Sequence, residues 1–283
     1  MRRIILSLIA AFMAGAAFAQ DYATIRSYLT LASYDKAKEE LDKAMNTPGF
    51  SGYPEAYILK ASVYAALGMD KSKQKTAAGD KLTDEGDAAF RRYREMDPSL
   101  MLLREPAYQN GVMNLYSGYY ASGYNDYALK NWNAAYGKMK KAMEYSDLLI
   151  EKRMVNITLD TNALILAGVA AENSGNTDDA GNYYGRLADA KITGAGFESV
   201  YRFMVSYCFK KKYMMLFERY RTTGAELYPQ SEYFKYDKVD FAVGSENDYA
   251  AKMKALEGIL NSDPDDFKAN EVMGELIYDQ LNP

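Results

Sequence analysis

The chain has 283 residues, of which 48% are hydrophobic and 25% are charged, and its formal net charge is −4. These proportions are typical of a folded globular protein, and the acidic balance argues against nucleic-acid binding, which needs concentrated positive charge. The chain has no histidine and one cysteine, Cys208. This excludes Ser-His-Asp and Cys-His catalysis, histidine-based metal sites and an internal disulfide. We expect no cofactor, no metal and no enzyme activity.

Residues 1–19 have the pattern of a secretory signal peptide. Arg2 and Arg3 precede an apolar run, and a small-x-small site ends at Ala19. The run is on the short side for a transmembrane helix. The pattern predicts export and cleavage after Ala19, which places the mature chain in the periplasm or outside the cell. Because no cysteine follows the cleavage site, we expect neither a lipid anchor nor a membrane span in the mature chain.

Apolar residues at helical spacing predict two helix pairs in the first third of the mature chain, over 20–50 and 54–98. Residues 48–54, which include two glycines and two prolines, are expected to form a loop. Residues 69–85 have little apolar content. They are predicted to be an insertion in the second pair, either as an extra helical turn or as a mobile loop.

The same spacing continues to the end of the chain and predicts further helix pairs over 110–150, 160–192, 198–229, 233–264 and 267–283, the last of them incomplete. A helical solenoid normally ends in a polar capping helix, and none is recognisable before Pro283. We therefore expect the natural protein to continue beyond this point.

The stretch at 160–189 shows the pattern of one repeat most clearly. Leu164 and Gly168 lie on one predicted helix, Ala180 and Tyr184 lie on the next, and Gly175 is the turn between them. We expect Thr177 to cap the second helix. This pattern resembles the tetratricopeptide repeat (TPR) family, whose consensus of about 34 residues is W-x2-L-G-x2-Y…A-x3-F…P.

The resemblance covers most of the chain after residue 20, although Leu164 replaces the consensus Trp and Ile192 the final Pro. Pro229 and Pro264 lie about one repeat of 34 residues apart, which supports the phase. The resemblance implies an all-α fold, a right-handed superhelical solenoid of antiparallel helix pairs. The style of the repeats and the signal peptide resemble those of secreted bacterial envelope proteins of the Bacteroidetes type.

TPR proteins bind partners in a concave groove lined by the first helix of each pair, so the resemblance also implies a site. Tyr120, Tyr124 and Tyr127 follow i, i+4, i+7 spacing and share one helix face. The resemblance adds groove positions from the neighbouring repeats, at Asn162, Glu172, Arg202 and Phe209. The alternative is that these tyrosines pack between repeats. We expect Trp132 to pack at a repeat junction, Cys208 to be a buried inert thiol, and the lysine runs at 138–141 and 210–212 to be solvated helix faces.

These observations favour a non-catalytic periplasmic or secreted scaffold that binds a protein or peptide partner. One alternative is a glycan-binding module that uses the tyrosines as platforms. The other is the N-terminal part of an enzyme whose catalytic domain lies beyond residue 283.

Overall fold

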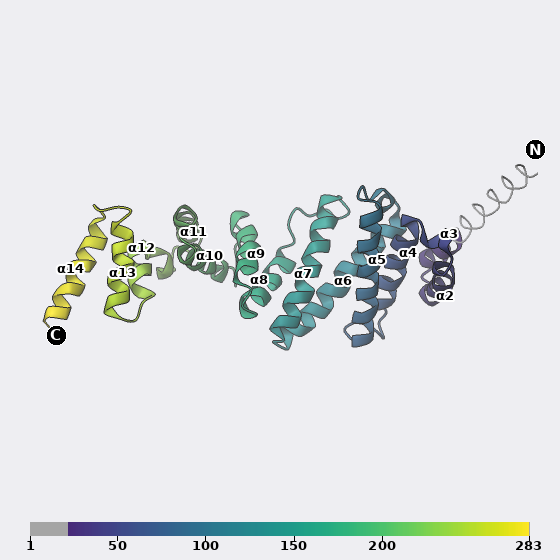
Figure 1. The fold of residues 1–283 in the computed structure, drawn as a ribbon, viewed down its shortest axis with the longest axis horizontal. Coiled ribbons are helices and arrows are strands. Elements are labelled where there is room, and N and C mark those ends of the chain that lie inside the picture. Colours follow the sequence, from purple (N-terminus) through teal and green to yellow (C-terminus); the bar gives the residue numbers. More distant parts are fainter. Residues whose placement is uncertain (1–21, 283) are drawn as a thin grey trace, which may run out of the picture. The chain divides into compact units, whose positions relative to one another are not determined.

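The structure, a computed structural model, describes residues 22–282, so the predicted signal peptide lies outside the described residues. Over this range the chain forms helices and turns and no strand (Figure 1). The all-α fold predicted from the sequence is therefore confirmed. The chain divides into two compact units, Met1–Ala180 and Gly181–Pro283, with the boundary inside one helix. Each unit is described by itself.

The first unit is a row of antiparallel helix pairs. Its elements are a helix over residues 22–30, α2 (Tyr34–Met45), α3 (Pro48–Ser51), α4 (Pro54–Gly68), α5 (Ala77–Met96), the 3-10 helix η1 (Met101–Arg104), α6 (Pro106–Ala128), α7 (Trp132–Glu151), α8 (Thr161–Asn173) and the start of α9 (Thr177–Asp189). Helix α4 packs on α5 and α6 packs on α7, and α4 also contacts α6 (Figure 1). This stacking of neighbouring pairs is the arrangement of an α solenoid. A right-handed superhelix along the whole chain stays a prediction.

Helix α4 lies at the centre of this unit and is buried on almost every side, because α2, α5 and α6 all pack against it. Small residues allow the close approach of α6. A Cβ atom added at Gly111 would lie 2.2 Å from the Ser62 Oγ and 2.8 Å from the Ser62 Cα. Gly111 therefore sets the distance between α4 and α6.

Two predicted segments differ from the structure. Residues 48–54 were expected to be a loop, but they contain the helical turn α3, whose Phe50 is fully buried and stacks on Tyr22. Burial of one aromatic ring thus stabilises a helix too short for its period to show in the sequence. Helix α9 begins at Thr177 itself, so Asn176 and not Thr177 is the residue that precedes the helix.

The second half of the segment 69–85 is helical, because α5 begins at Ala77. Its packing uses small residues where large apolar ones were expected. Gly79 and Thr83 are buried, and a Cβ at Gly79 would lie 2.2 Å from the Lys73 carbonyl oxygen. This absence of large side chains made the segment appear irregular in the sequence.

Several helices end in the same tight turn. At the end of α6, Lys130 has φ +59° and its N–H donates to the Tyr127 carbonyl at 2.9 Å, while the Asn131 N–H donates to the Asp126 carbonyl at 2.8 Å. This pair of bonds defines a Schellman turn, which satisfies the last carbonyls of a helix. Turns with the same bonds and a positive φ also centre on Ala32, Arg153, Gly175, Lys191 and Lys212. The sequence predicted only the turn at Gly175, because the other positions are not glycine.

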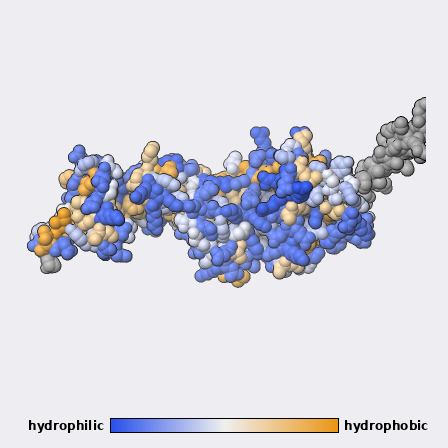
Figure 2. Space-filling view, viewed as in Figure 1, coloured by the Kyte–Doolittle hydropathy of each residue, from blue (hydrophilic) through white to orange (hydrophobic). Residues whose placement is uncertain are grey.

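The second unit continues from Gly181 within α9. It contains α10 (Glu198–Lys210), α11 (Met214–Leu227), the 3-10 helix η2 (Glu232–Lys235), α12 (Lys238–Gly244), α13 (Tyr249–Leu260) and α14 (Phe267–Leu281). Tyr201 and Val205 of α10 are fully buried, as is Phe217 of α11. Helix α14 leaves Ile277, Tyr278 and Leu281 exposed, and Figure 2 shows hydrophobic residues on its surface.

Cys208 lies on the buried face of α10 and is fully covered. Burial disfavours the charged thiolate and raises the pKa of the Cys208 thiol to about 11. The thiol therefore has the buried, inert character expected from the sequence.

Candidate functional site

Helix α6 carries a row of aromatic side chains along one face. The ring centroids of Tyr116 and Tyr120 are 5.7 Å apart, and those of Tyr124 and Tyr127 are 6.3 Å apart in a stacked arrangement. The row continues to Trp132 at the start of α7, whose ring meets Tyr127 edge-on at 5.5 Å. We call these five residues the aromatic row.

One end of the aromatic row is fixed and the other is open. The Tyr116 hydroxyl donates to the Asp160 carboxylate at 2.6 Å. Asp160 also accepts the Ala163 N–H at 3.0 Å, which caps α8, and the Ser146 hydroxyl at 3.0 Å. Farther along the row Tyr124 is 49% exposed. The bond to Asp160 fixes the Tyr116 ring, which in turn contacts the ring of Tyr120.

Burial raises the pKa of Tyr120, with Asp160 and Tyr124 adding to the effect. The phenol therefore stays neutral at physiological pH and presents a hydroxyl together with a ring face. Such a surface offers apolar contact area and hydrogen bonds without a net charge.

The structure places the predicted site residues in two groups. Tyr120, Tyr124 and Tyr127 lie together on α6, Asn162 is exposed in the first turn of α8, and Glu172 is exposed near its end. Their part in binding stays a prediction. The sequence missed Tyr116 as a member of the row, although it lies four residues before Tyr120 on the same face. Trp132 packs at the junction of α6 and α7 as expected, but it remains partly exposed.

Arg202 and Phe209 belong to the second unit. The Arg202 guanidinium lies 4.6 Å from the ring centroid of Tyr233 and pairs with Glu198 at 3.6 Å. The Phe209 ring packs on Phe217 at 5.6 Å and on Phe241 at 5.5 Å, so its contacts within this unit are packing contacts.

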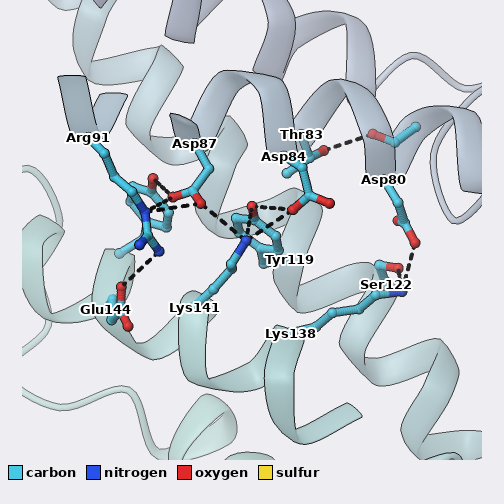
Figure 3. Close-up of polar contacts among 12 residues, drawn as sticks. Asp80, Thr83, Asp84, Asp87, Arg91, Tyr119, Ser122, Lys138, Lys141 and Glu144 are labelled. Atoms are coloured by element: carbon cyan, nitrogen blue, oxygen red, sulfur yellow. Dashed lines mark hydrogen bonds and ion pairs between the residues drawn. The ribbon is translucent and has the colours of Figure 1, made fainter. Parts of the chain in front are cut away.

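A cluster of charged and polar side chains, which the sequence did not predict, joins α5 to α7 (Figure 3). Asp87 of α5 is only 5% exposed and accepts the Tyr145 hydroxyl at 2.6 Å. The Lys141 ammonium lies 3.1 Å from Asp87 and 3.0 Å from Asp84. Tyr119 of α6 donates to Asp84 at 2.7 Å. We call these five residues the ion cluster.

A neighbouring lysine extends the polar contacts along α7. The Lys138 ammonium pairs with Asp80 at 2.7 Å and donates to the Ser122 hydroxyl at 2.7 Å (Figure 3). It also pairs with Asp126 at 2.9 Å. Between Lys138 and Lys141 lies a cavity of about 240 Å³. Gly118 and Gly137 are among the residues that line it.

The prediction that the lysines at 138–141 form a solvated face is wrong for two of the three. The side chains of Lys138 and Lys141 are only 27% and 31% exposed, and each is held by two carboxylates. Lys140 pairs with Asp179 at 2.8 Å and is more exposed. Only tertiary packing shows this difference, because α5 supplies most of the partner carboxylates.

Burial opposes ionisation of Asp87, but the Tyr145 hydrogen bond and the positive charge of Lys141 outweigh it and lower the pKa of this carboxyl below its ordinary value of 3.8. Asp87 is thus charged at neutral pH and fully partnered. The ion cluster therefore holds α5 against α7 and contains no group that stands free for chemistry.

Within residues 22–282 no group of three or more Cys, Asp or Glu side chains is arranged to hold a metal ion. Nor does this part of the chain contain a helix of the length and apolar character that a membrane crossing requires.

Comparisons with known proteins give limited information. No protein-family model matches the chain, and no curated protein matches it. Solved structures that match include that of pilF from Pseudomonas aeruginosa, at 15% sequence identity over 93% of this chain and 99% of the other, with a TM-score of 0.31. A likeness at this level indicates no function.

Proposed function

We propose that this protein is a non-catalytic scaffold of the TPR type that binds an extended segment of a partner protein along the aromatic row. The observation that carries the proposal is the row itself, which runs from the anchored Tyr116 to the exposed Tyr124. Aromatic side chains give large contact area at low entropic cost and dominate the energy of many protein interfaces.

The dimensions of the row support a peptide as ligand. Tyr116 and Tyr127 are eleven residues apart on α6, which corresponds to about 16 Å along a helix axis. An extended peptide covers this length with about five residues. Because the rings are neutral, we expect a segment rich in apolar or aromatic residues rather than a strongly charged one.

The test uses a phage-displayed random peptide library selected on the full chain. We expect selected peptides to bind wild type and to bind the Tyr124→Ala variant roughly tenfold more weakly, since the loss of one exposed interface aromatic costs about 1–2 kcal/mol. Affinities are measured by fluorescence anisotropy of labelled peptides. Tyr124 is half exposed, so the variant is expected to keep its fold, which circular dichroism checks.

The matched control is Tyr53→Ala, because Tyr53 is also an exposed tyrosine of the first unit, 60% accessible, and lies outside the aromatic row. Peptides that bind wild type, Tyr124→Ala and Tyr53→Ala equally would place the site elsewhere.

The glycan alternative is favoured by the stacked pair Tyr124 and Tyr127, whose ring planes differ by 14°. Two results together would favour a glycan as the ligand. The library would yield no binding peptide, and calorimetry would show heat of binding with a glycan that is lost in Tyr124→Ala.

We further propose that the scaffold acts after export, in the periplasm or outside the cell. The support is the order of Arg2, Arg3, the apolar run and Ala19 in the sequence. Expression in a Gram-negative bacterium, followed by osmotic release and N-terminal sequencing, tests this. We expect a chain that begins at Gln20. An uncleaved chain retained in the cytoplasm would contradict the proposal.

A further inference from the structure

The second unit contains a cavity of about 540 Å³ whose lining comes from η2, α12 and α14 and from the segment that joins η2 to α12. Val239 in this lining is buried, whereas Gly244 and Ser245 are exposed. The cavity is therefore open to solvent on one side and closed by packed side chains on the other. Its volume lies in the range of about 300–1,000 Å³ that is usual for sites of small organic molecules.

Most of the lining is apolar, and much of it is aromatic. It includes three aromatic residues and three valines: Tyr233, Tyr236, Phe241, Val239, Val243 and Val272. The rings of Tyr233 and Phe241 are perpendicular, with centroids 5.5 Å apart, and Tyr236 is 51% exposed. The face of an aromatic ring carries partial negative charge, so it attracts a cation as well as apolar groups. The Arg202 guanidinium, 4.6 Å from the Tyr233 ring centroid, already makes a contact of this kind.

Asp240 is the charged residue of the lining, and its two hydrogen bonds end on the same oxygen. The Asp237 N–H donates to the Asp240 Oδ2 at 2.9 Å, and the Lys268 ammonium donates to it at 2.5 Å. Neither bond uses Oδ1, so this oxygen is available to a further positive group. Lys268 also donates to the Asp237 carboxylate at 3.0 Å. One ammonium is thus shared between two carboxylates, and the three groups together keep a negative charge.

The part of the chain that builds most of the lining is strongly acidic. Residues 236–283 contain eleven Asp or Glu residues against four Lys residues, a net charge of −7, whereas the whole chain carries −4. The positive groups near the lining are paired, since Lys238 lies 2.6 Å from Asp266 and Arg202 lies 3.6 Å from Glu198. The charge around the cavity therefore favours a cation over an anion.

We propose that this cavity binds an organic ammonium ion, a quaternary ammonium group with an apolar substituent. The apolar part contacts the rings and the valines, and the positive charge lies over the faces of Tyr233 and Tyr236 and within reach of Asp240. A metal ion is a poorer occupant, because it needs several oxygen ligands and the lining provides one carboxylate. The site lies in the second unit, and the proposal does not depend on the aromatic row.

Two glycines allow the cavity to be filled with a matched control. Gly244 lines the cavity and Gly258 of α13 does not, and at each of them an added Cβ would meet nothing within 4 Å. Gly244→Leu should therefore occupy the cavity and keep the fold. Gly258→Leu adds the same side chain elsewhere in the same unit. Circular dichroism and thermal unfolding check that both variants fold.

The experiment compares two probes of the same shape, choline and 3,3-dimethylbutan-1-ol, in which a carbon atom replaces the charged nitrogen. Valine methyl groups labelled with ¹³C report binding by NMR, because Val239, Val243 and Val272 lie in the lining. At low salt we expect choline to shift these resonances with an affinity roughly tenfold higher than that of the neutral alcohol. Gly244→Leu should abolish the shifts, and Gly258→Leu should keep them.

Two further variants test the charge and the ring separately. Asp240→Asn keeps an acceptor for the Asp237 N–H but removes the charge, so it should weaken choline binding roughly tenfold and leave the alcohol unchanged. Tyr236→Leu replaces an exposed ring by an aliphatic side chain and should weaken choline binding roughly fivefold, again without effect on the alcohol. Equal affinity for the two probes, choline shifts that persist in Gly244→Leu, or no shift at the three valines would each overturn the proposal.

Discussion

Gly111→Ala is expected to destabilise the first unit by about 2–3 kcal/mol, because overpacking a tight helix contact forces the backbone to move. The added Cβ would meet the Ser62 Cα at 2.8 Å, and a backbone atom cannot rotate away as a side chain can. Helices α4 and α6 must therefore separate. Unfolding in urea, followed by the fluorescence of Trp132 within the same unit, measures the change.

Two further variants make this prediction specific. Gly137 lies inside α7 and has nothing within 4 Å of the position of an added Cβ. Gly137→Ala should therefore stabilise the unit by about 0.5–1 kcal/mol, the usual difference between glycine and alanine in a helix. Ser62→Gly combined with Gly111→Ala should recover part of the loss, since it removes two of the three clashing atoms. Equal effects at positions 111 and 137 would contradict the close approach of α4 and α6.

Asp87→Ala should destabilise the same unit by about 3 kcal/mol, since removal of one partner of a buried ion pair leaves its other members with less compensation. Tyr145 would lose the acceptor of its hydroxyl, and Lys141 would lose one of its two carboxylates. Lys141→Met should cost less, about 1 kcal/mol, because the side chain of Lys141 is 31% exposed and is partly screened by water. A double-mutant cycle gives the coupling between the two.

The ion cluster also predicts how stability depends on pH. The pKa of Asp87 is lower in the folded state than its ordinary value of 3.8, so the contribution of Asp87 is present above that value and is lost as the pH falls below it. Asp87→Asn removes the titrating group. The free energy of unfolding of wild type should therefore approach that of Asp87→Asn between about pH 5 and pH 2. A constant difference between the two across this range would show that Asp87 is not stabilised in its charged form.

The helical spacing of apolar residues in the sequence predicted much of the architecture. Residues such as Ala37 and Leu41 in α2, or Ala135 and Met139 in α7, recur four positions apart and are fully buried. A helix must bury one face to be stable, so this spacing predicts both the helix and its inner side. Helix geometry likewise places Tyr120, Tyr124 and Tyr127 on one face of α6 without knowledge of any neighbour.

What depended on tertiary contacts was not visible in the sequence. Helix α3 is held by the stacking of Phe50 on Tyr22. The first turns of α5 pack through Gly79 and Thr83, where the small size of the side chains and not their hydrophobicity allows burial. Lys138, Lys140 and Lys141 look alike in the sequence, but carboxylates of α5 and α6 partly cover two of them in the folded chain. The sequence by itself determined the helices and their buried faces, because these follow from local periodicity. The ion cluster and the exposure of each tyrosine were decided by the tertiary structure, because both depend on which residues distant in the chain lie beside them.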